Sequence, residues 1–310
     1  MATLIASHHT HTTCSIGEPV FSNSLNPLLR QRFVEPFRPY ALSRDQIEAY
    51  ARDGYLVVRD LLTPEETENI ILWTNQVKSW DGKTSEPYLQ YDENTEEGSV
   101  RCSSENFVSV HQGFAKLLGK GHLPNTISDL YAGENVYLFK EKINYKVAKA
   151  GGYAPHIDAS AYEHLKSLKH KIHTTLLIAV EEATVENGCL EVVPGSHIDG
   201  RINPIPTVGG KTITDEWTAT HKWKGVPLKP GEALIFDSYL AHRSGPNHTD
   251  SGRACLYATY TTQLEGEEVH KDYYEHRCKY WPATANRNPK QDYSEGANIY
   301  AWATPMTAAE

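Results

Sequence analysis

Long apolar runs and an excess of basic residues are both missing from this 310-residue chain. No stretch of 18 consecutive apolar residues occurs, so no transmembrane helix is expected. There are 30 Lys and Arg residues against 39 Asp and Glu residues, which gives a formal net charge of −9. This balance makes a nucleic-acid backbone or an anionic membrane a poor general partner.

Cysteine is scarce and shows no paired spacing. The five cysteines are odd in number and no CxxC occurs, which argues against a disulfide scaffold and a thiolate zinc site. The N-terminus lacks the basic start and long apolar centre of a secretory signal, and the C-terminal AAE is not a peroxisomal address. We therefore expect a cytoplasmic protein with a small-molecule substrate, and the sequence leaves monomer and homodimer open.

The pattern along the chain predicts an α+β fold with a jelly-roll core. Residues 1–40 show no sustained period and are expected to form an extension, so that 41–310 form a single domain. Residues 43–54 and 63–80 have helical spacing, and from residue 136 onward about eight β-like segments alternate with turns. Residues 199–226 are long for a loop and predict a lid-like insertion.

Residues 153–162, YAPHIDASAY, carry a His and an Asp two positions apart. In a strand such residues point to the same face, so His156 and Asp158 would present an imidazole and a carboxylate together. His242, which follows the apolar segment ALIF, offers a distant third ligand. Two imidazoles and one carboxylate leave three metal positions open, as in non-haem Fe(II) oxygenases, whereas structural zinc prefers four protein ligands.

A carboxylate-binding pair follows the third candidate ligand. Arg253 lies 11 residues after His242, beyond a Ser-Gly-Pro-Asn turn and at the start of an apolar segment. If that turn closes a hairpin, the guanidinium enters the same cavity and can bind a carboxylate through two hydrogen bonds. Ser244 would add a hydroxyl to the same carboxylate.

Together, the H-x-D pair, NGCLEVVPGSH, PGEALIFDSYLAHRSGPN and Arg253 resemble the phytanoyl-CoA dioxygenase family of Fe(II)- and 2-oxoglutarate-dependent oxygenases. The resemblance covers residues 45 to about 265 and implies a double-stranded β-helix. It implies that His156, Asp158 and His242 hold iron, and that Arg253 and Ser244 bind the distal carboxylate of 2-oxoglutarate. The implied reaction uses O2 to oxidise a C–H bond by hydroxylation, desaturation or ring formation, with release of succinate and CO2.

Other contacts follow from the same resemblance or from residue chemistry. The segment FKEKINYK is similar to a strand that contacts both substrates in related hydroxylases, which nominates Lys140 and Asn144 for the co-substrate and Lys142 for the substrate. Arg101 is a further candidate for an anionic substrate, and Trp217 for the wall of a cavity that takes a flatter molecule. The resemblance favours a small polar metabolite, aminoalkylphosphonates included, and a secondary-metabolite intermediate also fits.

Two other classes of function share part of this pattern. A cupin-type metal-dependent lyase or isomerase would use the same ligands without needing Arg253 beside Ser244. A catalytically silent metabolite-binding homologue would usually have lost a ligand or that arginine, and none is lost here. An Fe(II)- and 2-oxoglutarate-dependent dioxygenase is therefore the preferred prediction.

Overall fold

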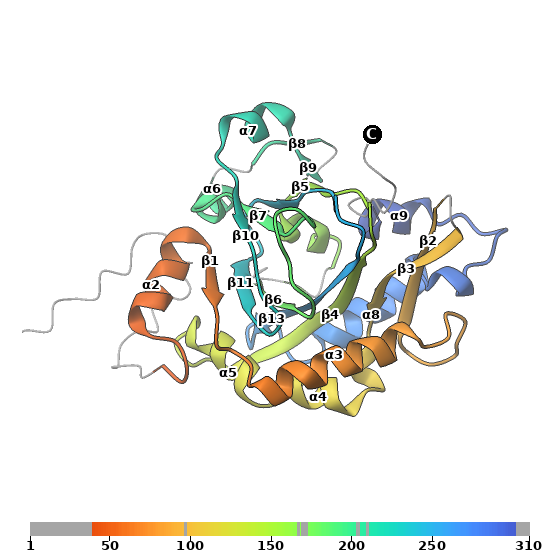
Figure 1. The fold of residues 1–310 in the computed structure, drawn as a ribbon, viewed down its shortest axis with the longest axis horizontal. Helices are drawn as coiled ribbons and strands as arrows, with labels where there is room; N and C mark the ends of the chain where they lie inside the picture. The colour runs from red at the N-terminus through yellow and green to blue at the C-terminus, as the bar shows by residue number, and fades with distance from the viewer. Residues whose placement is uncertain are drawn as a thin grey trace, which may run out of the picture.

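Two antiparallel β-sheets lie at the centre of the protein (Figure 1). The computed structural model describes residues 39–95, 98–165, 168, 173–202, 205–208 and 211–301. The sheet orders are β1-β11-β6-β13-β4-β3-β2 and β10-β7-β12-β5-β9-β8. The strands are Tyr55–Val58 (β1), Leu89–Thr95 (β2), Gly98–Glu105 (β3), Val136–Lys146 (β4), Tyr153–His156 (β5), His173–Ala179 (β6), Leu190–Val192 (β7), Thr207–Val208 (β8), Thr212–Ile213 (β9), Lys224–Val226 (β10), Ala233–Asp237 (β11), His242–Ser244 (β12) and Arg253–Thr262 (β13).

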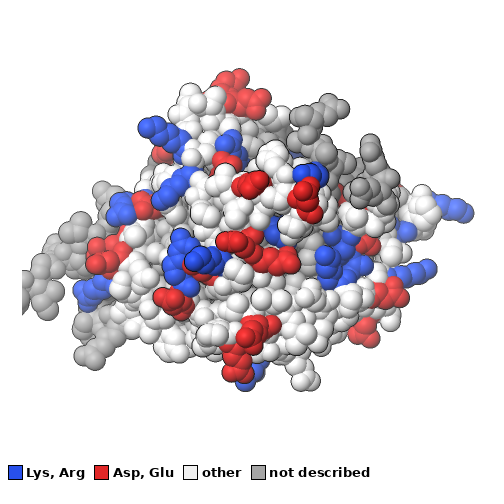
Figure 2. All heavy atoms as spheres, viewed as in Figure 1, with Lys and Arg blue, Asp and Glu red and all other residues white. Residues whose placement is uncertain are grey.

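Along the chain, helices occur before, between and after the strands. In Figure 1, α3 and α4 run along the lower edge of the view. On the face seen in Figure 2, basic and acidic side chains are interspersed. In the described part of the chain, no helix combines the length and the apolar character needed to cross a membrane. The helices are Arg44–Asp53 (α2), Pro64–Lys78 (α3), Gln112–Gly119 (α4), His122–Asp129 (α5), Ser196–Ile202 (α6), Asp215–Thr220 (α7), Val269–Tyr280 (α8) and Ser294–Tyr300 (α9), with 3-10 turns at Phe107–Ser109 (η1), Asp158–Tyr162 (η2) and Thr284–Asn286 (η3).

Both faces of the seven-stranded sheet are buried at its centre, because side chains there alternate between two cores. In β6, Leu176 and Ile178 join the core that contains the buried residues of α3, α4 and α5. Their neighbours Leu177 and Ala179 join a second core, which contains residues of β7 and β10 from the other sheet. Alternation of this kind is expected for a strand with a period of two.

Strand β4 follows the same alternation but places polar groups on its inward face. Ile143 and Tyr145 belong to the helix-covered core. Lys142, Asn144 and Lys146, at the alternate positions, line an internal cavity between the sheets. Buried ammonium groups are costly unless another charge compensates them, so this inward face identifies the interior as a functional site.

The helices predicted near the N-terminus are confirmed. The hydroxyl of Ser43 accepts a hydrogen bond from the Gln46 amide, and the Gln46 side chain accepts one from the Ser43 amide. Helix α2 then ends at Gly54, whose φ of +78° is a conformation that glycine adopts without strain. Thr63 and Glu66 form the same reciprocal cap at the start of α3.

The predicted insertion is built largely of regular structure. Residues 199–226 contain most of α6 and all of β8, β9, α7 and β10. Strand β9 pairs with β5 and β10 pairs with β7, so this segment is tied to the six-stranded sheet. Its role as a lid stays a prediction. Residues 1–38 of the predicted N-terminal extension lie outside the described residues.

The hairpin expected between His242 and Arg253 was wrong. Strand β12, which begins at His242, pairs with β5 and β7 in the six-stranded sheet. Strand β13, which begins at Arg253, pairs with β4 and β6 in the other sheet. The connection therefore crosses between the sheets, where the Asn247 side chain donates to the backbone oxygens of Val147 and Ser251. Arg253 reaches the interior from the sheet opposite His242.

Candidate metal centre and its two cavities

Three side chains of metal-ligand type meet where β5 pairs with β12 in the six-stranded sheet. His156 ends β5, Asp158 begins η2 and His242 begins β12. The two histidines are direct partners in the pairing of β5 with β12. Nε2 of each histidine lies 3.8 Å from Asp158 Oδ1, and one ligand atom from each residue lies within 4.8 Å of the others. These distances suit a single metal ion.

Backbone hydrogen bonds determine which ring nitrogens face this centre. Nδ1 of His156 donates to Ala154 O at 2.6 Å, and Nδ1 of His242 donates to Leu240 O at 2.9 Å. Because a carbonyl oxygen only accepts, Nδ1 carries the proton and Nε2 directs its lone pair toward Asp158. Two neutral imidazoles and a carboxylate form a donor set that fits Fe(II).

Burial and local charge favour the ligating protonation states. Burial and the adjacent His242 lower the pKa of His156 to about 3, and burial also lowers the pKa of His242. Burial opposes ionisation of Asp158, but neighbouring positive charges, foremost that of Lys140, outweigh it and hold the pKa of Asp158 below its usual value. At neutral pH both rings are therefore neutral and the carboxylate is ionised.

A cavity of about 40 Å³, which we call the inner chamber, connects this centre with Arg253. Its walls include the inward faces of β4 and β13, which are paired residue by residue. The cross-strand pairs are Arg253 with Lys146, Cys255 with Asn144, Tyr257 with Lys142 and Thr259 with Lys140. Ser244, from the opposite sheet, lines the same chamber, so the structure brings together the predicted carboxylate binders Arg253 and Ser244 with Asn144, which was predicted to contact the co-substrate.

The backbone around Gly188 holds the guanidinium of Arg253. Nε of Arg253 donates to Asn187 O at 3.2 Å, and Nη2 donates to Gly188 O. Gly188 has a φ of +73°, and a Cβ at this position would lie 2.2 Å from Gly245 O. Only glycine allows the two backbones to come this close. The predicted Asn-Gly turn thus anchors the arginine.

A second cavity of about 300 Å³, which we call the outer pocket, meets the inner chamber at the metal centre. The two cavities share lining residues that include Lys140, Lys142, His156 and Asp158. The outer pocket then extends to a wall formed by β2, β3, α8, η3 and α9. A volume of 300 Å³ lies at the lower end of the range for small-molecule sites.

Two lysines project from β4 toward both cavities. The ammonium of Lys140 lies 4.6 Å from the ring centre of Tyr162 and 5.9 Å from that of Tyr273. The ammonium of Lys142 lies 5.1 Å from the ring centre of Tyr257. Among the described residues, no carboxylate lies within 4.0 Å of either ammonium. Burial lowers the pKa of Lys140 to about 8 and lowers that of Lys142 as well.

Arg277 of α8 forms the far wall of the outer pocket. Its Nη2 makes a buried ion pair of 2.6 Å with Glu105 of β3. The guanidinium lies between the rings of Tyr91 and Tyr300, at 4.7 and 4.6 Å from their centres. Tyr300 is fixed by hydrogen bonds of 2.9 and 2.8 Å with His164 and His276. This wall is therefore aromatic, and an ion pair and two hydrogen bonds hold its side chains.

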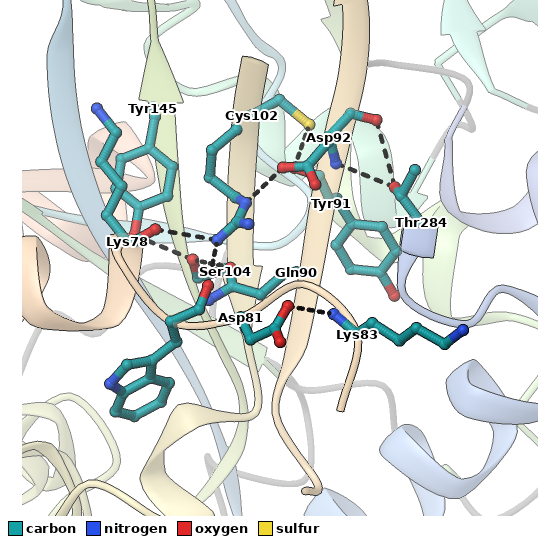
Figure 3. Close-up of polar contacts among 12 residues, drawn as sticks. Lys78, Asp81, Lys83, Gln90, Tyr91, Asp92, Cys102, Ser104, Tyr145 and Thr284 are labelled. Carbon is teal, nitrogen blue, oxygen red and sulfur yellow. Dashed lines mark hydrogen bonds and ion pairs between the residues drawn. The ribbon is translucent and has the colours of Figure 1, made fainter. Parts of the chain in front are cut away.

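The hairpin of β2 and β3 supports the pocket but directs Arg101 away from it. Figure 3 shows Asp92 bonded to Thr284 of η3, and Cys102 bonded to the Tyr91 carbonyl. Arg101 donates to Asp92 and to the backbone oxygen of Lys78. The register places Tyr91 opposite Ser103 but Asp92 opposite Arg101, so Cys102 forms a bulge that reverses the alternation. Arg101 is accordingly not among the residues that line either cavity.

Trp217 also lies outside both cavities. It stacks on His221 with ring centres 3.6 Å apart, and it packs against the apolar cluster that contains Ile213 and Ala241. The substrate contact predicted for Trp217 is therefore not supported by its position. Its aromatic character gave no signal that distinguished a core residue from a pocket residue.

Sequence reasoning missed two parts of the site. Lys146 was not placed in the co-substrate cavity, yet it lines the inner chamber directly opposite Arg253. Its spacing of two from Asn144 was the available signal, because both must share a strand face. The second part is the far wall from α8 to α9, which includes Arg277 and Tyr300. No sequence motif there indicated that these helices return to the metal centre.

Comparison with known proteins identifies the family. Residues 50–255 match the family described as Phytanoyl-CoA dioxygenase (PhyH). The chain belongs to this family. As a member of the phytanoyl-CoA dioxygenase family it is an oxidoreductase that uses Fe(II), 2-oxoglutarate and O2. The preferred prediction is thereby confirmed over the lyase, isomerase and silent-homologue alternatives.

Two curated relatives carry names of phosphonate enzymes. The chain is 36% identical over 233 residues to a methylphosphonate hydroxylase of Gimesia maris, with 75% of this chain and 85% of the relative covered. It is 28% identical over 266 residues to a 2-aminoethylphosphonate dioxygenase of an uncultured bacterium, with 85% and 98% covered.

Solved structures share the fold. EctD from S. alaskensis with 2-oxoglutarate and 5-hydroxyectoine has a TM-score of 0.60 at 20% identity, over 72% of this chain and 77% of that one. The alpha ketoglutarate dependent epimerase SnoN has a TM-score of 0.55 at 22% identity, over 70% and 80%. The α+β class and the jelly-roll core are thereby confirmed.

Proposed function

We propose that His156, Asp158 and His242 hold the iron and that 2-oxoglutarate binds in the inner chamber with its distal carboxylate on Arg253 and Ser244. The hydrogen bonds that fix both Nε2 lone pairs toward Asp158 support the ligand assignment. The chamber that joins the metal centre to Arg253 supports the co-substrate assignment. When bound, iron and 2-oxoglutarate would allow O2 to oxidise a C–H bond of the substrate, with conversion of the 2-oxoglutarate to succinate and CO2.

The residues of this chain would bind and orient the co-substrate and the substrate, and they would exclude water from the site. The guanidinium of Arg253 is held by backbone carbonyls, so it is already oriented before a carboxylate arrives. Asn144 lies between the chamber and the outer pocket, because it lines both. Lys140, predicted for the co-substrate, lies over the rings of Tyr162 and Tyr273, which line only the outer pocket. We therefore assign Lys140 to the substrate side, together with Lys142.

The substrate we propose is a small organic anion with a phosphonate or carboxylate group. The observation that carries this is the pair of lysines beside the metal centre, which form no ion pair within 4.0 Å among the described residues. Burial disfavours both ammonium charges, and a bound anion would offset that cost. The two relatives named for phosphonates agree with this class.

The outer pocket also limits the size and shape of this anion. Its far wall presents the rings of Tyr273 and Tyr300 and the side chain of Trp281. A cavity of about 300 Å³ is larger than a one-carbon phosphonate needs. We therefore expect the anionic group to carry an organic body that packs against these rings.

An anaerobic titration tests the proposal in two stages. Fe(II) and then 2-oxoglutarate are added to the metal-free protein while the visible charge-transfer band of a chelated 2-oxo acid is recorded. We expect the band, and its loss in His156→Ala. Phosphonates, carboxylates and matched neutral amides are then compared for substrate-dependent succinate release. Metal binding without the band would refute the co-substrate site, and a preference for the neutral amides would refute the anionic substrate.

A further inference from the structure

We propose that Arg287 forms a second anion-binding subsite at the far wall of the outer pocket and binds an acidic group of the substrate there. The substrate then carries two acidic groups, one on Lys140 and Lys142 beside the metal centre and the other on Arg287. This inference rests on the proposed function, because it extends the anionic substrate assigned to the same pocket. Arg287 lines the outer pocket but not the inner chamber.

The segment that carries Arg287 orients its side chain. Arg287 follows η3 directly, and η3 is held on β2 by the hydrogen bond that the Asp92 amide donates to the Thr284 hydroxyl (Figure 3). The guanidinium carbon lies 3.6 Å from the ring centre of Trp281, and Nε donates to Pro282 O at 3.1 Å. A planar guanidinium that stacks on a ring and uses Nε in this way keeps its two terminal nitrogens for a ligand.

These terminal nitrogens have no partner in the part of the chain that the structure describes. No carboxylate there lies within 4.0 Å of the partly buried Arg287 guanidinium, and Nε makes its one hydrogen bond. Two acidic side chains that line the same pocket are already paired with other arginines. Asp92 accepts from Arg101, and Glu105 accepts from Arg277 at 2.6 Å. Arg287 therefore has unused donors that face the pocket.

A second guanidinium adds positive charge to the same wall. Arg277 and Arg287 both lie over the ring of Tyr91, with their guanidinium carbons 4.7 and 5.8 Å from its centre. Among the described residues, Glu105 is the one carboxylate that forms an ion pair with either of them. The wall thus keeps an excess of positive charge, and a bound anion would offset the repulsion between the two guanidinium groups.

The cations at the two ends of the pocket also influence each other through Arg277. Burial is the main cause that lowers the pKa of Lys140 to about 8, and it lowers the pKa of Lys142 and of Arg287 as well. The positive charge of Arg277 lowers all three pKa values further. A ligand with one acidic group would compensate the charge at one end only. A ligand with an acidic group at each end would compensate both.

The experiment is calorimetric titration of the Mn(II)-loaded protein, with saturating 2-oxoglutarate present so that the inner chamber is filled. The probes are 4-phosphonobutanoate and butylphosphonate, which differ in one terminal carboxylate, and adipate and hexanoate, which differ in the same way. Homologues with shorter and longer chains are titrated alongside. We expect the best dianionic probe to bind at least roughly 10-fold tighter than its counterpart with one acidic group, because the second group gains a charge-assisted hydrogen bond.

Three variants locate the group that reads the second acid. Arg287→Met should lose the preference and bind butylphosphonate as the wild type does, whereas Arg287→Lys should keep part of the preference. Lys290→Met is the matched control for the loss of one positive charge, because Lys290 is exposed and lines neither cavity. It should keep the preference in full. Lys142→Met should weaken both members of each pair alike, because Lys142 faces the acidic group that they share.

The outcomes separate this inference from the proposed function. If the wild type binds none of the probes, the anionic substrate fails, and the second subsite fails with it. If the wild type binds both members of each pair equally well, only the second subsite fails. An equal weakening of both members in Arg287→Met would show that Arg287 merely supports the wall. Loss of the preference in Lys290→Met would show a general effect of charge. A thermal melt of each variant checks that it is folded.

Discussion

The inner chamber and the outer pocket meet at the same metal centre but are built in different ways. The chamber is walled by strands of both sheets, and its polar residues face each other as cross-strand pairs. The outer pocket begins with strand residues and is completed by α8, η3 and α9. The strands of the chamber lie within residues 50–255 that match the family, apart from most of β13, of which only residues 253–255 are matched. The helices α8 and α9 follow that match.

We infer from this difference that the inner chamber serves the chemistry that members of the family share, and that the outer pocket selects the substrate. Strand pairing fixes the positions of Arg253 and Lys146 through the backbone, and a change of register would move every inward group to the other face. Helix α8 is held instead by side chains, such as the ion pair of Arg277 with Glu105. We expect changes in the chamber to affect every substrate alike, and changes in the helical wall to affect substrates selectively.

The largest effect is expected at the metal centre, where the two cavities meet. His242→Ala should lower Fe(II) affinity by at least roughly 100-fold, because a ligand matters at least as much as the groups that orient it. Succinate formation should cease with every substrate. His248→Ala is the matched control, because His248 is exposed. Retained metal-dependent turnover in His242→Ala would move the third ligand elsewhere.

Arg253→Met tests the chamber alone. We expect roughly 100-fold weaker binding of 2-oxoglutarate, because a buried carboxylate would lose its main charge partner. Fe(II) binding should be retained, as measured by titration of the metal. Arg243→Met provides the control, since Arg243 pairs with Glu191 and stacks on Trp223. Equal losses of Fe(II) and 2-oxoglutarate in the Arg253 variant would contradict the assignment.

Lys142→Met tests the substrate side. We expect the KM for an anionic substrate to rise roughly 10-fold, because a charge-assisted hydrogen bond is lost. The charge-transfer band of the iron and 2-oxoglutarate complex should keep its midpoint. Lys120→Met, at an exposed position, controls for the loss of one positive charge. A weakened band with an unchanged KM would place Lys142 with the co-substrate instead.

Arg101→Gln should have the smallest effect. Because Arg101 is held by Asp92 and the Lys78 backbone, outside both cavities, both KM values should stay within about twofold of the wild type. Steady-state kinetics with 2-oxoglutarate and with the substrate measure this directly. A tenfold rise in the substrate KM would restore the role that the sequence suggested for this arginine.

Candidate site residues could be predicted from the sequence where they belong to short local motifs. His156 and Asp158 lie two positions apart in the chain, and His242 precedes a recognisable turn, so short-range pattern was sufficient to nominate three side chains that the structure brings together. Arg101 was misplaced because one bulge residue, Cys102, reverses the strand alternation that a regular pattern assumes. The place of Arg277 in the pocket could not be predicted from the sequence. It depends on how α8 packs against β3 and β4, which are far from α8 in the chain.

The position of α8 and α9 in the chain has a consequence for how such an enzyme can diversify. Both helices follow β13, so they add no strand to either sheet and interrupt no strand pairing. Duplicated copies of the gene could therefore acquire different far walls by exchanging one contiguous stretch, while the residues that we propose for iron and 2-oxoglutarate are inherited unchanged. In a chimera that carries the α8–α9 segment of a relative, the choice of substrate should move with that segment.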